Sequence, residues 1–229
     1  MINRTKRLFV AFFMLMSLPA LAQLTPAQLA QSSKYLEAEL SPDGKHIAVV
    51  LTQDGERKMI VLDTSNFKLV GATAFAGQEE VGEIHWVNNE RIVIKVVKKR
   101  GWLEVPHYYG ELYAVDYDGS RTKMIYGFRA GEKQTGSKLK KRKSTFGWAY
   151  IIDYLPEDDR HILIESRPMS EGGEKLSTVH KLNVYTGIMS NSLAKSPISY
   201  PEFHTDQNSN LRLVAVSYTH LRAHETPIN

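Results

Sequence analysis

The chain has 229 residues, 42% of them apolar and 24% charged, which is enough for a domain with a substantial core. Its formal net charge of +4 includes three basic residues before residue 23, and Arg222 and Glu225 cancel, so residues 23–215 carry only +1 and lack the basic surplus of nucleic-acid binders. The absence of cysteine excludes disulfides, a thiol nucleophile and thiolate metal ligands.

Residues 1–22 have the pattern of an export signal. A basic start with Arg4, Lys6 and Arg7 precedes the apolar run LFVAFFMLMSL, and small residues at 20–22 fit a cleavage site before Gln23. The run is shorter than the ~20 apolar residues of a comfortable membrane span. An uncleaved anchor is the alternative. In both cases we expect the body outside the cytoplasm, in the periplasm or secreted, and after cleavage we expect no stable membrane span.

The next segment, residues 23–40, predicts a short lead helix at about 26–33 followed by an entry stretch. Thr25 is a suitable N-cap and Pro26 suits the first helical position. SPDG at 41–44 then has turn chemistry, KHIAVVLT is typical of a strand, and QDGE predicts a hairpin turn into the returning strand RKMIVLDT.

This turn–strand–turn–strand unit recurs along the chain. The matching positions are Ile47, Ile92 and Ile162 in the outgoing strands and Asp63, Asp116 and Asn183 after the returning strands. The spacing is 45 residues from 47 to 92 and 70 residues from 92 to 162, and a polar insertion at about 129–147 accounts for the longer step.

A period near 45 residues with about four strands per unit is typical of β-propeller blades. The sequence therefore predicts an all-β fold: an incomplete β-propeller of about three to four blades of four-stranded antiparallel sheet over residues 41–215, after the lead helix. A β-sandwich with irregular hairpins is the alternative, but it does not explain the recurring order.

The segment LTPAQLAQSSKYLEAELSPDGKHIAVV resembles the mature N-terminus of exported members of the prolyl oligopeptidase family of serine peptidases. The strand ends YAVDYDG and NVYTG and the segment DQNSNLRLVA are similar to that family's propeller, so the resemblance covers roughly residues 23–215. It implies a propeller of about seven or eight blades that gates peptide access to a C-terminal α/β-hydrolase domain with a Ser–Asp–His triad.

That catalytic domain has no counterpart in this sequence. An α/β-hydrolase presents its serine in a G-x-S-x-G elbow, and the pentapeptide does not occur here. We therefore assign no catalytic, cofactor-binding or metal-binding residue and no cofactor, and we leave open whether the chain acts as an enzyme. Its expected role is substrate gating for peptides. The alternative is a non-enzymatic periplasmic propeller that serves as a protein-binding scaffold.

Residues 216–229 resemble a non-native tail. Val216 to Glu225 match, residue for residue, the conceptual translation of a transposase-type sequencing-library adapter, Val-Ser-Tyr-Thr-His-Leu-Arg-Ala-His-Glu. We therefore expect that native coding sequence stops at about Ala215 and that the fragment is marginally stable or prone to aggregate.

Other features have ordinary explanations beside functional ones. The basic stretch at 137–144 could bind an anionic partner, but a solvated loop is the preferred interpretation. The acids in PEDDR could form a carboxylate pair or only suit a turn. The six histidines that precede the tail lack metal-ligand spacing; they are His46, His85, His107, His161, His180 and His204. The aromatic residues could line a channel, but packing between blades is preferred; they are Trp86, Trp102, Trp148, Tyr108, Tyr109 and Tyr150.

Overall fold

The computed structural model describes residues 34–101, 105–131, 144–170 and 175–215. Within these ranges the fold is all-β, apart from one 3-10 turn, η1 (Arg129–Gly131). The strands are β1 (Tyr35–Leu40), β2 (His46–Gln53), β3 (Glu56–Asp63), β4 (Leu69–Thr73), β5 (Glu79–Trp86), β6 (Arg91–Lys98), β7 (His107–Asp116), β8 (Lys123–Tyr126), β9 (Gly147–Asp153), β10 (His161–Pro168), β11 (Thr178–Asn183), β12 (Ala194–Lys195), β13 (Glu202–Thr205) and β14 (Leu211–Ala215).

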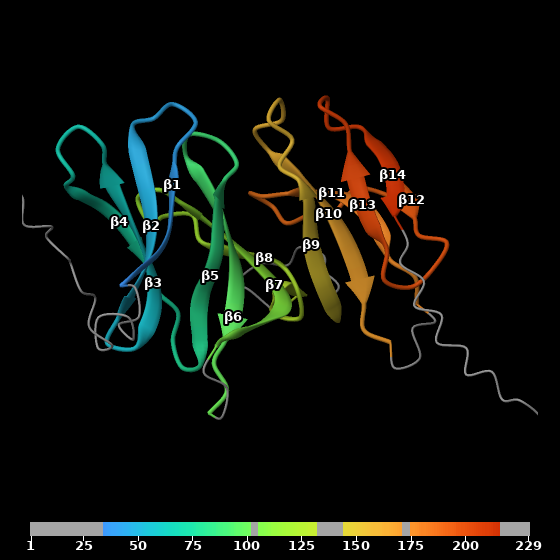
Figure 1. Ribbon diagram of the computed structural model, residues 1–229, viewed down its shortest axis with the longest axis horizontal. Coiled ribbons are helices and arrows are strands. Elements are labelled where there is room, and N and C mark those ends of the chain that lie inside the picture. The colour runs from blue at the N-terminus through green and yellow to red at the C-terminus, as the bar shows by residue number, and fades with distance from the viewer. Residues whose placement is uncertain (1–33, 102–104, 132–143, 171–174, 216–229) are drawn as a thin grey trace, which may run out of the picture. The chain divides into compact units, whose positions relative to one another are not determined.

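The strands form four antiparallel sheets in chain order. Strands β1–β4, β5–β8 and β9–β12 make three four-stranded sheets, each pairing consecutive strands, and β13 pairs with β14 in a two-stranded sheet. We call these sheets 1 to 4, and Figure 1 shows them side by side from blue to red. Consecutive four-stranded meanders that pack face against face are the blades of a β-propeller, so the described part of the chain is an incomplete propeller.

The repeat read from the sequence is confirmed by strand register. His46 pairs with Asp63 in sheet 1, and His161 pairs with Asn183 in sheet 3. In sheet 2 the same place is taken by Arg91 opposite Asp116. The equivalent isoleucines follow directly in β2, β6 and β10, so each blade repeats one hairpin register.

Apolar runs in the second strands of sheets 2 and 3 arise because these two blades are covered on both faces. In β6, Ile92 and Ile94 belong to the core cluster shared with sheet 1, whereas Val93 between them belongs to the cluster shared with sheet 3. Successive side chains of a strand point to opposite faces, so a strand buried on both faces is apolar throughout. A third, smaller cluster with Leu163 and Phe203 joins sheets 3 and 4.

Arg91 links sheets 2 and 3 by polar contacts within this apolar setting. Its side chain is 1% exposed. Nη1 donates to Asp116 Oδ1 at 2.8 Å, and Nε and Nη2 donate to the carbonyl oxygen of Val184 at 3.2 and 2.9 Å. A buried guanidinium is tolerated only when its donors are satisfied in this way.

The first blade starts earlier than the sequence indicated. We placed the propeller from residue 41, with SPDG opening the first blade, but strand β1 precedes SPDG and pairs with β2. SPDG is therefore the hairpin between them. Here the Ser41 hydroxyl donates to Asp43 Oδ1 at 2.7 Å, and Gly44 adopts a φ of 70°. The lead helix, the export signal, the tail and most of the basic stretch lie outside the described residues.

In the described ranges, no helix is long and apolar enough to cross a membrane. The same ranges contain no group of three or more histidine, aspartate or glutamate side chains placed to hold a metal ion.

Candidate functional site

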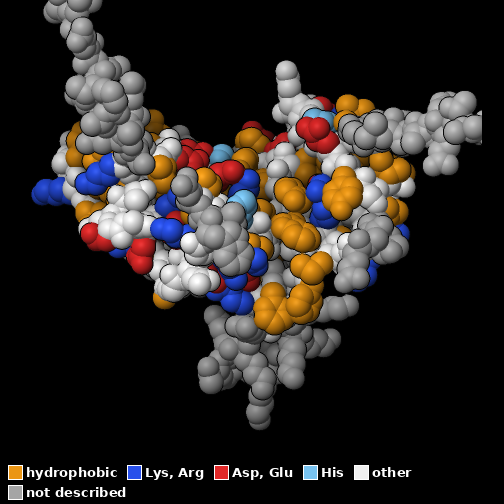
Figure 2. Space-filling view, turned by 60° about the horizontal axis from the view of Figure 1, so that its bottom comes forward, with side chains coloured by type: hydrophobic (Ala, Val, Ile, Leu, Met, Phe, Trp, Pro, Cys, Tyr) orange, Lys and Arg blue, Asp and Glu red, His pale blue; other side chains and the backbone are white. Residues whose placement is uncertain are grey.

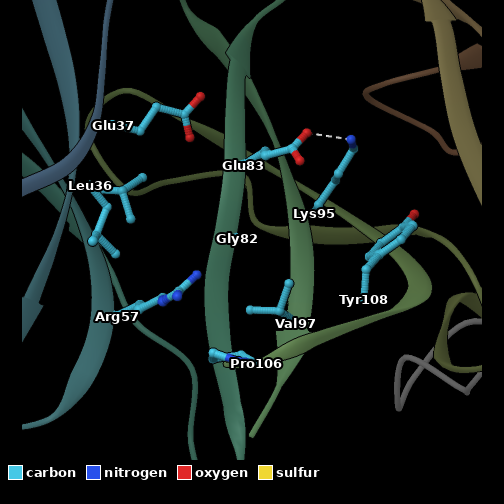
Figure 3. Close-up of a pocket in the computed structure, with 10 residues that line it drawn as sticks. Leu36, Glu37, Arg57, Gly82, Glu83, Lys95, Val97, Pro106 and Tyr108 are labelled. Atoms are coloured by element: carbon cyan, nitrogen blue, oxygen red, sulfur yellow. Dashed lines mark hydrogen bonds and ion pairs between the residues drawn. The ribbon is translucent and has the colours of Figure 1, made fainter. Parts of the chain in front are cut away.

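A hollow of about 310 Å³ is lined by residues of β1, β2 and β3 in sheet 1 and of β5, β6 and β7 in sheet 2. Its wall includes Glu37 from β1, Glu83 from β5, and Lys95 from β6 (Figure 3). Figure 3 shows the Lys95 ammonium directed to the Glu83 carboxylate, with which it forms an ion pair. Gly82 on the floor of this hollow lies against β6, because an added Cβ would come within 2.6 Å of the Lys95 carbonyl oxygen.

The two glutamates of β1 satisfy backbone donors on β5. Strand β5 is the first strand of its sheet and, among the described strands, pairs only with β6, so some of its N–H groups have no ladder partner there. Glu37 Oε2 accepts the N–H of Ile84 at 3.2 Å, and Glu39 Oε2 accepts the N–H of Trp86 at 3.1 Å. The Trp86 indole N–H donates in turn to the Glu39 carbonyl oxygen at 3.0 Å. These contacts fix sheet 1 against sheet 2 along their first strands, β1 and β5. We call the first-strand side of each sheet its inner edge.

The inner edges bring three carboxylates close together. Burial raises the pKa of Glu37, and the neighbouring charges of Glu83 and Glu39 add to the effect. Burial raises the pKa of Tyr154 to about 12, with contributions from the same three glutamates. Glu39 Oε1 also contacts His85 Nδ1 at 2.7 Å, and the His85 ring stacks on Tyr154, the residue that follows β9. Three sheets therefore contribute to one ionisable cluster.

A row of cations and tyrosines continues from this cluster toward sheet 3. Lys95 Nζ lies 5.9 Å from the centre of the Tyr108 ring, and the Tyr108 and Tyr150 rings meet edge to face with centroids 6.4 Å apart. The Arg167 guanidinium lies 4.4 Å from the centre of the Tyr150 ring. We call Glu37, Glu83, Lys95, Tyr108, Tyr150 and Arg167 the inner row.

The inner row offers binding chemistry of two kinds. Its carboxylates accept N–H groups and its cations donate to carbonyl or carboxylate oxygens. Its tyrosines supply flat apolar surface with a polar end. Tyr108 is fixed by donating its hydroxyl to the Ala149 carbonyl oxygen at 2.7 Å, so its ring has a defined orientation. An extended peptide carries the matching groups: alternating N–H and C=O with side chains on both sides.

The histidines are distributed over the sheets, each with its own surroundings. His46 stacks between Trp86 and Tyr117, His161 Nδ1 contacts Asp158 Oδ1 at 2.9 Å, and His180 Nδ1 lies 2.9 Å from the Ser190 carbonyl oxygen. His204 pairs with Glu202 at 3.7 Å, and His107 is exposed at the start of β7. Of the six, His85 alone enters the cluster described above.

Of the other residues singled out in the sequence, the aromatic ones divide between core and surface. Trp86 is 3% exposed and lies in the core between sheets 1 and 2, which agrees with the interpretation that the aromatic residues pack between blades. Trp148 and Tyr150 instead line a surface pocket with Arg167, and Tyr109 lines a neighbouring one. Trp102 lies outside the described residues. Among the acids of PEDDR, Asp158 contacts His161 and Lys181, which suits a turn.

Sequence reasoning missed the acidic and basic members of the inner row. Glu37, Glu39 and Glu83 lie on strands that run along exposed inner edges, where charged residues do not interrupt an apolar pattern. The alternation in YLEAEL was the available signal, because it places two glutamates on one face of a strand.

No protein-family model and no curated protein matches the chain. Solved structures that resemble it include TolB from Acinetobacter baumannii (17% identity, TM-score 0.36), which the chain matches over 75% of its own length and 35% of the other. The β-propeller domain of the Trilobed protease from Pyrococcus furiosus gives 14% identity, TM-score 0.35, and coverages of 65% and 40%. A structure from an analysis of two prolyl endopeptidases gives 17% identity, TM-score 0.38, and coverages of 79% and 23%.

The chain thus spans well under two thirds of the length of each of these proteins. At such identities the likeness concerns the fold alone. The class of the molecule follows from its own sheets: it is an incomplete β-propeller of three four-stranded blades and a two-stranded fourth sheet.

Proposed function

We propose that the chain is the substrate-gating propeller part of an exported serine peptidase of the prolyl oligopeptidase type, located in the periplasm or secreted. The α/β-hydrolase domain would belong to the parent protein beyond residue 215. The observation that supports a peptide-handling role is the inner row, in which charged and aromatic side chains of three successive blades lie next to one another. Glu37, Glu83 and Tyr150 of this row lie on the first strands of their blades. The first strands of neighbouring blades face the central channel in a closed propeller.

Peptide binding by the full chain tests the role of the inner row. The probe is a fluorescently labelled peptide of about eight residues with tyrosine and lysine, since an extended backbone fits an edge surface. We expect Glu83→Gln to weaken binding about threefold to tenfold, because a charge-assisted hydrogen bond is lost. Glu83 is 69% exposed in its side chain, so this change should not disturb folding.

Glu56→Gln is the matched control for this measurement. Glu56 is also exposed and also pairs with a lysine, Lys58, but it lies at the β2–β3 hairpin, away from the inner row. Equal affinities of Glu83→Gln and Glu56→Gln in fluorescence anisotropy would contradict a peptide-handling role for the inner row.

Long-read sequencing of the source locus tests the peptidase parentage separately. We expect the frame to continue past the codon of Ala215 through further blades to G-x-S-x-G, then Asp, then His. A frame that completes the propeller and stops would overturn the parentage while leaving the peptide-binding result untouched.

A scaffold role is the second candidate, and one surface feature favours it. Hydrophobic side chains gather on the face that Figure 2 brings forward, next to basic ones. Phe128 and Phe146, 49% and 61% exposed, hold their rings 4.8 Å apart at the surface. Exposed aromatic pairs of this kind are common in protein interfaces. A folded partner whose binding is lost in Phe146→Ser, with peptide binding unchanged, would favour the scaffold.

A further inference from the structure

A second pocket, of about 200 Å³, lies where sheet 3 meets the start of sheet 4. Trp148 and Tyr150 from β9 form one wall, Arg167 at the end of β10 lies at its centre, and Tyr200 ahead of β13 forms the other wall. Lys175 and Met169 are also in the lining. The pocket therefore combines apolar walls with two cations.

The Arg167 guanidinium is held between two tyrosine rings. Its carbon Cζ lies 4.4 Å from the centre of the Tyr150 ring and 5.4 Å from the centre of the Tyr200 ring. Nε donates to Glu165 Oε1 at 2.8 Å, and Nη2 reaches Glu165 Oε2 at 3.2 Å and the Pro201 carbonyl oxygen at 3.3 Å. Glu165 is 4% exposed, so this carboxylate is an internal anchor rather than a ligand group.

One amino group of the guanidinium remains available in the pocket. Nη1 makes no hydrogen bond to the described residues, whereas Nε and Nη2 are both engaged. Because the bonds of Nε and Nη2 fix the plane of the guanidinium, Nη1 is preorganised to donate a charge-assisted hydrogen bond to a carboxylate oxygen. The stacking rings prevent the side chain from turning away.

Tyr200 provides an independent observation at the same place. Its φ is 54°, in the left-handed region that a bulky residue seldom adopts, and its side chain is 70% exposed. Left-handed backbone is unfavourable for a residue with a Cβ. Because Tyr200 is largely exposed, packing of its side chain does little to offset this strain. The strained backbone places the Tyr200 ring over Arg167. Strain of this kind concentrates at ligand clamps.

We propose that this pocket binds a carboxylate attached to an apolar group. Arg167 Nη1 donates to the carboxylate, Lys175 adds positive charge, and the rings of Trp148 and Tyr200 contact the apolar part. A peptide's C-terminal carboxylate with an apolar last side chain and a free aromatic or branched carboxylic acid share this chemistry. The site goes beyond the proposed peptide handling, because its geometry would bind such a group whether or not the parent protein cleaves peptides.

The test compares two probes that differ only in charge, N-acetylphenylalanine and N-acetylphenylalanine amide, with the full chain in a calorimetric titration. We expect the acid to bind at least about tenfold more tightly than the amide, as a charge-assisted bond is worth more than a neutral one. A third probe, glycyl-glycyl-phenylalanine, separates the two sources: tighter binding than the acid indicates a peptide C-terminus, and equal binding indicates a free acid.

Two variants locate the site. Arg167→Lys keeps a positive charge beside Glu165 but removes the separate Nη1 group that faces the ligand, and we expect affinity for the acid to fall about fivefold to tenfold. Tyr200→Gly removes the ring and relieves the positive φ, so affinity should fall severalfold while the melting temperature does not decrease. Arg160→Lys is the control, since Arg160 also lies over a tyrosine ring, that of Tyr185, but in another part of sheet 3.

Three results would overturn the proposal. Acid and amide of equal affinity would show that no carboxylate is recognised. A Tyr200→Gly variant that melts like the parent chain and binds the acid equally well would show that the strained tyrosine has no part in binding. A loss of affinity in Arg160→Lys equal to that in Arg167→Lys would place the binding elsewhere.

Discussion

Arg91 stands where sheets 1 and 3 have histidine, and this exchange gives the second blade an additional link. Its guanidinium forms an ion pair with Asp116 in its own sheet and donates a hydrogen bond to the Val184 carbonyl oxygen in sheet 3. It also lies 5.1 Å from the centre of the Tyr185 ring. Removing the guanidinium would leave the buried Val184 carbonyl oxygen without this donor, and Asp116 would keep only Arg121 as a cationic partner.

We therefore expect Arg91→Met to lower the free energy of unfolding by about 1–3 kcal/mol, the cost of leaving a buried hydrogen-bond acceptor such as the Val184 carbonyl oxygen without its donor. Urea denaturation followed by tryptophan fluorescence measures the change. Arg212→Met serves as the control, because Arg212 pairs with Asp206 at the surface with 67% of its side chain exposed. A loss below 1 kcal/mol for Arg91→Met, similar to the control, would contradict the linking role.

Single residues also show what sequence could and could not reveal. The equivalence of Ile47, Ile92 and Ile162 could be predicted from the sequence, because each isoleucine follows a turn motif at a fixed distance. The contact of Glu39 with His85 could not be predicted from the sequence, because it joins strands of different blades. Nothing local in either strand specifies that partner. The positive φ of Tyr200 has no sequence signal either, since glycine or asparagine would be the usual choice.

Among the elements, the hairpins follow local rules closely. In the β1–β2 turn, Asp43 accepts hydrogen bonds from the Ser41 hydroxyl and the Lys45 N–H. In the β13–β14 turn, Asp206 accepts the N–H groups of Asn208 and Asn210. These bonds to the ionised carboxylates lower both pKa values to about 2, from an ordinary value of 3.8.

This predicts a loss of stability in acid. Because the folded-state pKa values are lowered, the carboxylates stabilise the fold fully above about pH 4, and this contribution is lost as the pH falls toward 2. Melting temperatures measured between pH 6 and 2 should fall less steeply in the double variant Asp43→Asn, Asp206→Asn than in the parent chain. Parallel curves for the two proteins would show that the turns do not carry this dependence.

The first element of each blade was the hardest to predict. Strand β1 has the burial pattern of an edge, with exposed Tyr35, Leu36 and Leu40, and its glutamates reduce the β-propensity of the segment. The second strands were the easiest, because burial on both faces makes them uniformly apolar. Sequence therefore located the centre of each blade and missed the inner edge, where the candidate site lies.

At the scale of the whole molecule, the two outer sheets differ from the inner ones. Ile47 and Val49 in β2 correspond in register to Ile92 and Ile94 in β6, which pack on the preceding sheet. Ile47 and Val49 themselves belong to none of the three core clusters of the described residues. At the other end, strand β14 pairs with β13 only. Ile47 is half-buried and Val49 buried, so the first face of sheet 1 is less closely packed than the equivalent face of sheet 2. At β14 the described residues leave one strand edge without a second partner.

We expect the chain to self-associate when expressed without further blades, because exposed strand edges and apolar faces pair with one another. Size-exclusion chromatography with light scattering over a concentration series, together with thermal denaturation, tests this. A monomer that melts sharply and cooperatively at all concentrations would be incompatible with the expectation. Leu213→Lys, at a side chain 58% exposed on β14, should reduce association if the edge is responsible.

Coverage of sheet 2 on both faces has a consequence for the order in which the chain opens. In a linear array of repeats, each unit is stabilised by its neighbours, so an interior unit has two stabilising contacts and a terminal unit has one. Amide protons of β6, between two apolar clusters, should exchange with deuterium most slowly, and those of β4 and β14 most rapidly. The second blade would then be among the last to lose its structure on unfolding, while sheets 1 and 4 at the two ends of the array open first.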